Sequence, residues 1–264
     1  MVEALRSADV AGTHVVSAHA VILGCGRSGT SIFGELFESL PSYQDRYYFE
    51  PAFDHLLTID FTCGPVAIKV PKVSPGQKTT PGLPFLLEDL LAIVPEPRVI
   101  FWQVRHPLDT ICSLRPGITA DWSHNPKPPD WMEWQNQPVI MQCARHWQHI
   151  NETGYLAVSD IATVMHYEDL VCDPHYFARK VCDKTGVNMV DHVEAIEAWA
   201  ARIGNAKSPD SYEAKRQVHW SRQDHATRVE RWRENLSPED VEMVRPVVEA
   251  AARLHGYDLP ERFA

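Results

Sequence analysis

The sequence lacks the features of several common protein classes. It contains no apolar run of about 18 residues, which predicts that no helix spans a membrane and that the protein is cytoplasmic. Lys and Arg number only 25 against 35 Asp and Glu. A formal net charge of -10 argues against a nucleic-acid partner, because binding a nucleic-acid backbone needs a broad basic surface. The six cysteines include no C-x-x-C pair, so we expect reduced thiols and neither a disulfide framework nor a zinc site.

The length and composition suit one α/β domain, because 264 residues with a 44% hydrophobic share can bury a sizeable core. Residues 1–17 mix charges and lack the apolar core of a signal peptide, so we expect a short disordered lead-in. We assign residues 18–264 to a single domain. A loop at about 116–138 is rich in proline and tryptophan, and it either covers a site or packs its tryptophans onto the core. The sequence leaves open a monomer or a homodimer.

An apolar run followed by a glycine-rich turn stands at residues 18–31, and this pattern predicts a buried strand, a phosphate-binding loop and a helix. The spacing Gly24-x-x-x-x-Gly29 is typical of loops whose backbone N–H groups converge on an anion. The lysine that a nucleoside triphosphatase carries after the second glycine is missing. The loop instead carries one arginine and three hydroxyls: Arg27, Ser28, Thr30 and Ser31. These groups suit a phosphate-like group held without a metal.

Two further segments bring charged residues toward the same place. The run Val66 to Val70 predicts a second buried strand, with Lys69 and Lys72 at its carboxyl end. In an open α/β sheet the ligand crevice lies at the carboxyl ends of the strands. The alternative, which is commoner for an isolated pair of lysines, is that both are solvated at a sheet edge. Glu50 stands among aromatic residues before a proline that favours an extended backbone. It is either a surface acid or a carboxylate held at a cleft.

A third strand predicts a second anion site. The run RVIFWQV at 98–104 ends at Arg105, and Pro107 then opens a helix. Ser113 lies eight residues beyond Arg105, two turns into that helix. A strand-end arginine and a serine so placed can meet on one phosphate. We therefore expect a second phosphate pocket beside the first.

Together, these motifs resemble those of the sulfotransferases that use 3′-phosphoadenosine 5′-phosphosulfate (PAPS). GCGRSGTS at 24–31 and RHPLDTICSLR at 105–115 are similar to the two cofactor motifs of that family. HYEDLVCDP at 166–174 and RVERWRENLSPEDVEMV at 228–244 are similar to later segments of bacterial and carbohydrate sulfotransferases. The likeness runs from about residue 18 to residue 257.

The resemblance implies an α/β fold of the P-loop-containing nucleotide-hydrolase type, with three layers and a mainly parallel central sheet flanked by helices. It implies transfer of a sulfuryl group from PAPS to a hydroxyl of a small-molecule acceptor, such as a sugar, a glycolipid or a secondary metabolite. The product of the donor is adenosine 3′,5′-bisphosphate (PAP), and no metal takes part. The implied donor-binding residues are Gly26, Arg27, Ser28, Gly29, Thr30, Ser31, Arg105, Ser113, Tyr167, Arg228 and Arg233.

Removing the proton of an acceptor hydroxyl calls for a general base. Phe49-Glu50-Pro51 matches the segment that supplies this acid in carbohydrate sulfotransferases, so the resemblance implies Glu50 as the base. Cytosolic members of the family use a histidine, for which His55 and His106 are the alternatives. Arg27 and Lys69 are the candidates for stabilising the transferred group. The remaining alternatives are a P-loop small-molecule kinase and a non-catalytic nucleotide-binding module.

Overall fold

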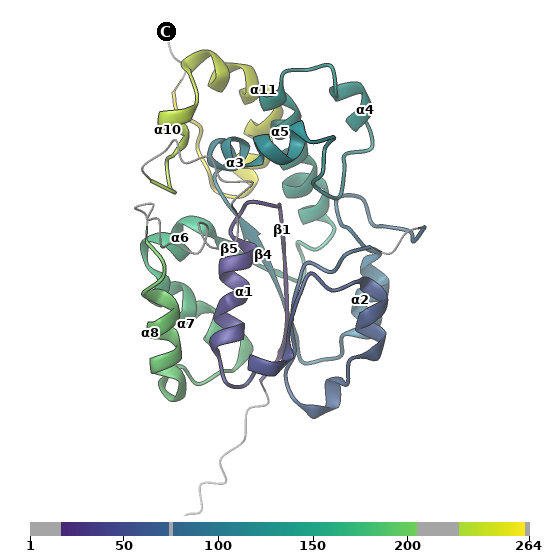
Figure 1. Ribbon diagram of the computed structural model, residues 1–264, viewed down its shortest axis with the longest axis vertical. Helices are drawn as coiled ribbons and strands as arrows, with labels where there is room; N and C mark the ends of the chain where they lie inside the picture. Colours follow the sequence, from purple (N-terminus) through teal and green to yellow (C-terminus); the bar gives the residue numbers. More distant parts are fainter. Residues whose placement is uncertain (1–16, 74–75, 205–226, 262–264) are drawn as a thin grey trace, which may run out of the picture.

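A five-stranded parallel sheet runs through the middle of the computed structural model, which describes residues 17–73, 76–204 and 227–261 (Figure 1). The strand order is β2-β3-β1-β4-β5, and each neighbouring pair is parallel. The strands are β1 (His19–Gly24), β2 (Tyr47–Phe49), β3 (Ala67–Lys69), β4 (Arg98–Val104) and β5 (Ala162–His166). Because all strands point the same way, their carboxyl ends lie along a single edge of the sheet.

Ten α-helices of the described residues surround this sheet. They are α1 (Thr30–Ser39), α2 (Leu87–Ile93), α3 (Pro107–Thr119), α4 (Trp131–Trp134), α5 (Val139–Gln148), α6 (Tyr167–Cys172), α7 (Pro174–Thr185), α8 (Val193–Ala200), α10 (Trp232–Asn235) and α11 (Pro238–Leu254). Short 3-10 turns lie at η1 (Gln44–Arg46), η2 (Phe53–Thr58), η3 (Phe61–Cys63) and η5 (Met189–His192), and a π-helical turn lies at η4 (His149–Gly154). Among the residues described, no helix has the length and apolarity needed to cross a membrane.

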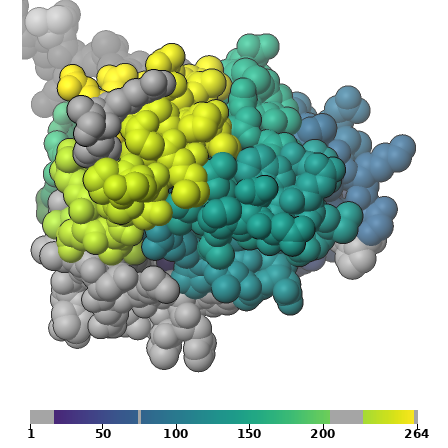
Figure 2. Space-filling view, turned by 90° about the horizontal axis from the view of Figure 1, so that it is seen from above, coloured from purple at the N-terminus to yellow at the C-terminus, as the bar shows by residue number. Residues whose placement is uncertain are grey.

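Strand β1 is buried on both faces, as its continuous apolar run predicts. Ala20 and Ile22 pack into one core with α1, α6, α7 and α8, while Val21 and Leu23 pack into a second core with α2, α3, α5 and α11. The helices of the first core lie to the left of the sheet in Figure 1. Seen from above in Figure 2, the yellow C-terminal residues lie against the teal segment that includes α5. The expected three-layer fold class is confirmed.

The loop expected at about 116–138 begins later than the sequence indicates. Helix α3 continues through Pro116 to Thr119, and ten of its residues are buried. A proline inside a helix removes one backbone hydrogen bond, and here the packing of α3 against α5 outweighs that loss. The loop also contains the short helix α4. The first tryptophan of the loop, Trp122, is buried in the second core, and Trp131 and Trp134 pack against that core.

Strand β2 is the element that the sequence pattern does not predict. It has three residues and lies at the edge of the described sheet, where it pairs with β3. Three residues are too few to show the alternation or the apolar run that distinguishes a strand.

Asp109, in the first turn of α3, fixes the segment that precedes α11. Its carboxylate accepts hydrogen bonds from the backbone N–H groups of Glu230 (2.8 Å) and Trp232 (3.0 Å), and its side chain is buried. We predict that Asp109→Ala lowers the free energy of unfolding by about 2–4 kcal/mol, because both N–H groups then lose a charged acceptor. Urea denaturation measures the change.

The matched control is Asp183→Ala, which removes an exposed carboxylate from α7. It should change the free energy of unfolding by less than about 0.5 kcal/mol. If the two variants are equally stable, the Asp109 contacts contribute nothing to the fold.

Candidate active site

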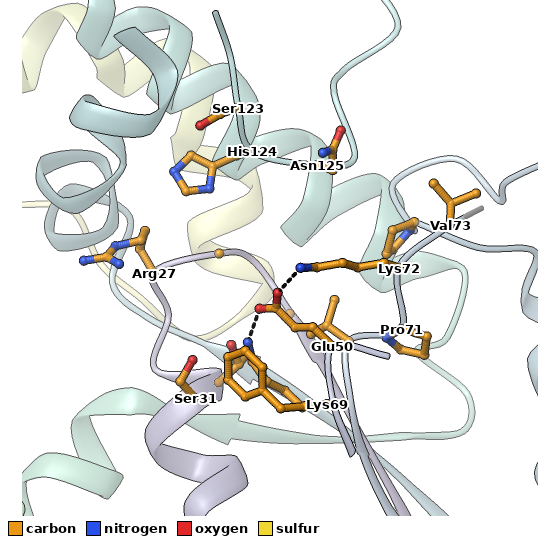
Figure 3. A pocket seen from close by; sticks show the side chains of 16 residues that line it. Arg27, Ser31, Glu50, Lys69, Pro71, Lys72, Val73, Ser123, His124 and Asn125 are labelled. Carbon is orange, nitrogen blue, oxygen red and sulfur yellow. Dashed lines mark hydrogen bonds and ion pairs between the residues drawn. The ribbon is translucent and has the colours of Figure 1, made fainter. Parts of the chain in front are cut away.

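A cavity of about 570 Å³ opens at the carboxyl edge of the sheet (Figure 3). We call it the strand-end cavity. The sequence-predicted residues that line it are Gly26, Arg27, Thr30, Ser31, Glu50 and Lys69. The structure thus brings the phosphate loop together with both predicted catalytic residues of the neighbouring strands.

The phosphate loop needs glycine at two positions. Gly24 has φ +138°, and a Cβ there would lie 2.2 Å from the carbonyl oxygen of Gln103. Gly29 has φ +87°, and a Cβ there would lie 2.3 Å from the ring of Tyr167. The predicted residue Tyr167 is therefore a buried packing partner of the loop. The loop keeps its shape because only glycine fits these two places.

The N-terminus of α1 is suited to an anion. No side chain of the described residues caps it, and its first turn carries no acidic residue, so the positive end of the helix dipole faces the strand-end cavity. Within the loop, Ser28 is fully buried, and its hydroxyl has no hydrogen-bond partner among the described residues. A buried polar group without a partner is costly unless a ligand satisfies it.

Arg27 joins the two sequence motifs. Its Nε donates a hydrogen bond to Ser113 Oγ at 3.0 Å, and its carbonyl accepts one from Arg105 Nη1 at 3.2 Å. The Arg105 guanidinium lies 4.3 Å from the centre of the Tyr167 ring and also donates to the Arg228 carbonyl. Arg105, Ser113, Tyr167 and Arg228 are buried and do not line the strand-end cavity, whereas Arg27 does. Because Arg27 contacts Arg105 and Ser113, the two predicted anion sites are adjacent.

The two late arginines have different surroundings. Arg228 is buried beside Arg105, whereas the Arg233 side chain is 58% exposed and pairs with Glu230 at 3.0 Å. Arg233 lies over the ring of Trp232 and does not line the strand-end cavity. Its donor-binding role stays a prediction. Residues 205–226, which precede Arg228 and carry Lys215, Arg216 and Arg222, lie outside the described residues.

The extended backbone that the sequence predicts at Glu50 is not found. Glu50 has φ +45° instead of the extended conformation that Pro51 favours, and Val70 at the end of β3 has φ +37°. Both conformations are unfavourable for residues with a side chain. They occur where the Glu50 N–H donates to the Lys69 carbonyl at 2.9 Å, so pairing of the two strand ends maintains them. The strained backbone directs the Glu50 carboxylate into the strand-end cavity.

Two lysines hold the Glu50 carboxylate. Lys69 forms an ion pair with one oxygen, and Lys72 forms one with the other at 2.7 Å (Figure 3). Burial acts to raise the pKa of Glu50, but the two ammonium groups together outweigh it, so the pKa lies below its ordinary value. Lys69 is itself only 3% exposed and lies 4.2 Å from the centre of the Phe49 ring. The carboxylate is therefore ionised at neutral pH.

The histidine alternatives lie elsewhere. His55 is an exposed residue of η2, and its Nδ1 forms a hydrogen bond with the Thr58 hydroxyl. His106 is packed between Trp232 and Tyr257, and burial is the main cause that lowers its pKa. Neither lines the strand-end cavity. The histidine that does line it is His124, which the sequence reasoning missed, because no local pattern shows where a residue of an irregular loop comes to rest.

The described residues contain no group of three or more His, Cys, Asp or Glu side chains placed to hold a metal ion. The charged groups that line the strand-end cavity are instead three cations, Arg27, Lys69 and Lys72, and one carboxylate, Glu50. Such an arrangement can bind an anion and accept a proton in the same space.

Comparisons with known proteins identify the family of the chain. A family model described as "Sulfotransferase family" matches residues 40–191, which is more than half of the chain. No curated protein sequence matches the chain.

Several solved structures have the same fold. The sulfotransferase domain of the olefin synthase of Synechococcus PCC 7002 has a TM-score of 0.53 at 17% identity, covering 93% of this chain and 96% of that one. The sulfotransferase domain of the curacin biosynthetic pathway has a TM-score of 0.53 at 15% identity, covering 93% and 99%. Mouse sulfotransferase SULT7A1, in complex with PAP, has a TM-score of 0.55 at 15% identity, covering 89% and 85%. With its fold shared along nearly the whole chain and a family model spanning more than half of it, the chain belongs to the sulfotransferase family.

Proposed function

We propose that this protein transfers a sulfuryl group from PAPS to a hydroxyl of a small-molecule acceptor and releases PAP. The observation that carries the proposal is the position of Glu50, an ionised carboxylate paired with Lys69, in the same cavity as the phosphate loop. A transferase needs both an anion site for the donor and a base for the acceptor, and here they share one space. The mouse structure with PAP bound supports this choice of donor.

The residues present fit the donor's two anionic ends. The unpartnered hydroxyl of Ser28 and the uncapped start of α1 suit the 5′-phosphosulfate. For the 3′-phosphate we propose Arg105 and Ser113, which both contact Arg27 at the back of the strand-end cavity. Their adjacency supports a single extended site for one ligand that carries two separate anionic groups.

In the proposed reaction, Glu50 accepts the proton of the acceptor hydroxyl. The acceptor oxygen forms a bond to sulfur as the bond from sulfur to the 5′-phosphate oxygen breaks, and that oxygen keeps the electron pair. Arg27 and Lys69 stabilise the negative charge on the oxygens around sulfur. Each residue acts from a fixed position, so the rate gain comes from orientation and preorganised charge.

The ion pairs of Glu50 explain how the base becomes active. Lys69 and Lys72 keep the carboxylate ionised but also make it a weaker base. A negatively charged donor competes with Glu50 for Lys69, and this competition raises the pKa of Glu50. Donor binding therefore strengthens the base at the moment it is needed.

The acceptor side of the strand-end cavity has a mixed character. Phe49, Val73 and Pro84 supply apolar surface, and Asn125 and Lys72 supply polar groups. This mixture favours a small acceptor with both an apolar part and a hydroxyl, which includes glycolipids and many secondary metabolites.

The proposal predicts a sulfated product. We expect that, with PAPS and pools of sugars, glycolipids or secondary metabolites, the protein releases PAP and increases the mass of one hydroxyl compound by one SO3 group. Mass spectrometry detects both products. The same pools with ATP and Mg²⁺ should remain unchanged, because Thr30 occupies the place of the loop lysine. A phosphorylated product instead would support the kinase alternative.

Replacing Glu50 with Gln tests its role as base. We predict that Glu50→Gln lowers kcat/KM about 10²–10⁴-fold, because the amide cannot accept the proton. PAP affinity, measured by calorimetry, should be retained or increase, because Lys69 loses its anionic partner. The control Glu38→Gln changes an exposed residue of α1 and should leave both quantities unchanged. Full turnover by Glu50→Gln would exclude Glu50 as the base.

Replacing Ser113 with Ala tests the 3′-phosphate site. We predict that Ser113→Ala weakens PAP binding about 10-fold, the loss of one hydrogen bond to a charged group, and leaves AMP binding unchanged. AMP lacks the 3′-phosphate. A direct contact between Ser113 and that phosphate therefore affects PAP alone, whereas a displaced Arg27 affects both ligands. The control Ser159→Ala changes a residue just before β5, at the edge of the sheet opposite the strand-end cavity. Equal weakening of PAP and AMP would contradict the assignment.

A further inference from the structure

His124 faces the strand-end cavity from the loop between α3 and α4. In Figure 3 its imidazole lies across the cavity from the Glu50 ion pairs and close to Arg27. It comes from neither of the two anion-binding motifs. It is therefore a candidate for a contact that the motifs alone do not supply.

Two glycines make room for the imidazole. A Cβ on Gly117 of α3 would lie 2.2 Å from His124 Nε2, and a Cβ on Gly26 of the phosphate loop would lie 3.2 Å from Nδ1. The first distance is a clash, and the second is closer than side chains ordinarily pack. The ring is thus held between the loop and α3 in a space that both glycines leave open.

The loop that carries His124 is firmly anchored. Trp122 is 1% exposed, and its Nε1 donates a hydrogen bond to His146 Nδ1 at 3.2 Å. The backbone N–H and the hydroxyl of Ser123 both donate to the Gly117 carbonyl at 2.9 Å. Asp121 and Trp122 have φ values of +54° and +52°. Two consecutive strained residues persist only where their surroundings fix them, and such strain is commonly found at functional sites.

Charged and titratable groups face His124 from three sides. Arg27 faces it from the phosphate loop, Glu50 faces it from the end of β2, and α5 presents the buried His146, whose ring centre is 5.7 Å away. Lys72 of the β3 end completes the wall of the strand-end cavity. Burial is the main cause that lowers the pKa of His124 to about 4, Arg27 lowers it further, and Glu50 opposes them. The imidazole is therefore neutral in the free protein at neutral pH.

We propose that His124 binds the donor: its imidazole takes up a proton from solvent when the phosphosulfate occupies the phosphate loop, and the imidazolium then hydrogen-bonds the donor oxygens beside Arg27. This inference rests on the proposed function. A bound anion offsets the charge of Arg27 and favours the cationic imidazole. His124 then supplies, from another loop, a cation that the phosphate loop lacks at Thr30.

The test is the number of protons taken up when PAP binds. Calorimetry at pH 6 in two buffers with different ionisation enthalpies gives this number for the wild type and for His124→Gln. The comparison removes the part of the phosphate ionisation that is common to both proteins, so the difference in proton uptake reports the effect of His124. We expect the wild type to take up about half a proton more, and its advantage in PAP affinity over the variant to shrink as the pH rises to 8.

Controls separate the possible failures. His55→Gln changes an exposed histidine outside the strand-end cavity and should match the wild type. The smaller variant His124→Asn should reproduce the loss seen with His124→Gln, and circular dichroism confirms that each variant is folded. PAP binding with equal proton uptake in all proteins overturns the role of His124 and leaves the proposed function intact. Absence of PAP binding to the wild type overturns both.

Discussion

The parallel direction of all five strands is the constraint on which the site depends. It places the carboxyl end of every strand at one edge of the sheet, and each of these ends carries a predicted functional residue. Arg27 follows β1, Glu50 follows β2, Lys69 ends β3, Arg105 follows β4 and Tyr167 follows β5. Strand pairing therefore brings residues up to 140 positions apart in the sequence to the same edge.

The charged residues at this sheet edge form two groups, one around Arg105 and one around Glu50. At the back, the Arg105 guanidinium ties together the phosphate loop, Tyr167 and the Arg228 carbonyl, which fixes a buried positive charge. At the front, Lys69 and Lys72 neutralise Glu50. The first group has the positive charge that the proposed donor site requires, and the second holds the ionised carboxylate that we propose as the base. The sulfotransferase family membership and the proposed sulfuryl transfer agree with both groups.

The sequence predicts the parts of this site that local patterns carry. The spacing of Gly24 and Gly29, the apolar runs of β1 and β4 and the position of Arg105 at a strand end all reflect short-range chemistry, and the structure confirms those elements. Three features need tertiary information. Strand β2 exists only because β3 offers an edge, Glu50 takes a left-handed backbone because two strand ends pair, and His124 reaches the strand-end cavity because Trp122 is buried. Helix α3 likewise continues past Pro116 because its neighbours cover it.

The central claim is that the phosphate loop and the Arg105 region form one site for a nucleotide with a separate 3′-phosphate. The most direct measurement is the affinity of the purified protein for PAP and for ATP with Mg²⁺, determined by calorimetry with the two ligands in competition. The account predicts that PAP binds at least about 100-fold more tightly, because the loop has no lysine for a triphosphate and Arg105 provides a second anion site. Tighter binding of ATP with Mg²⁺ than of PAP would contradict it.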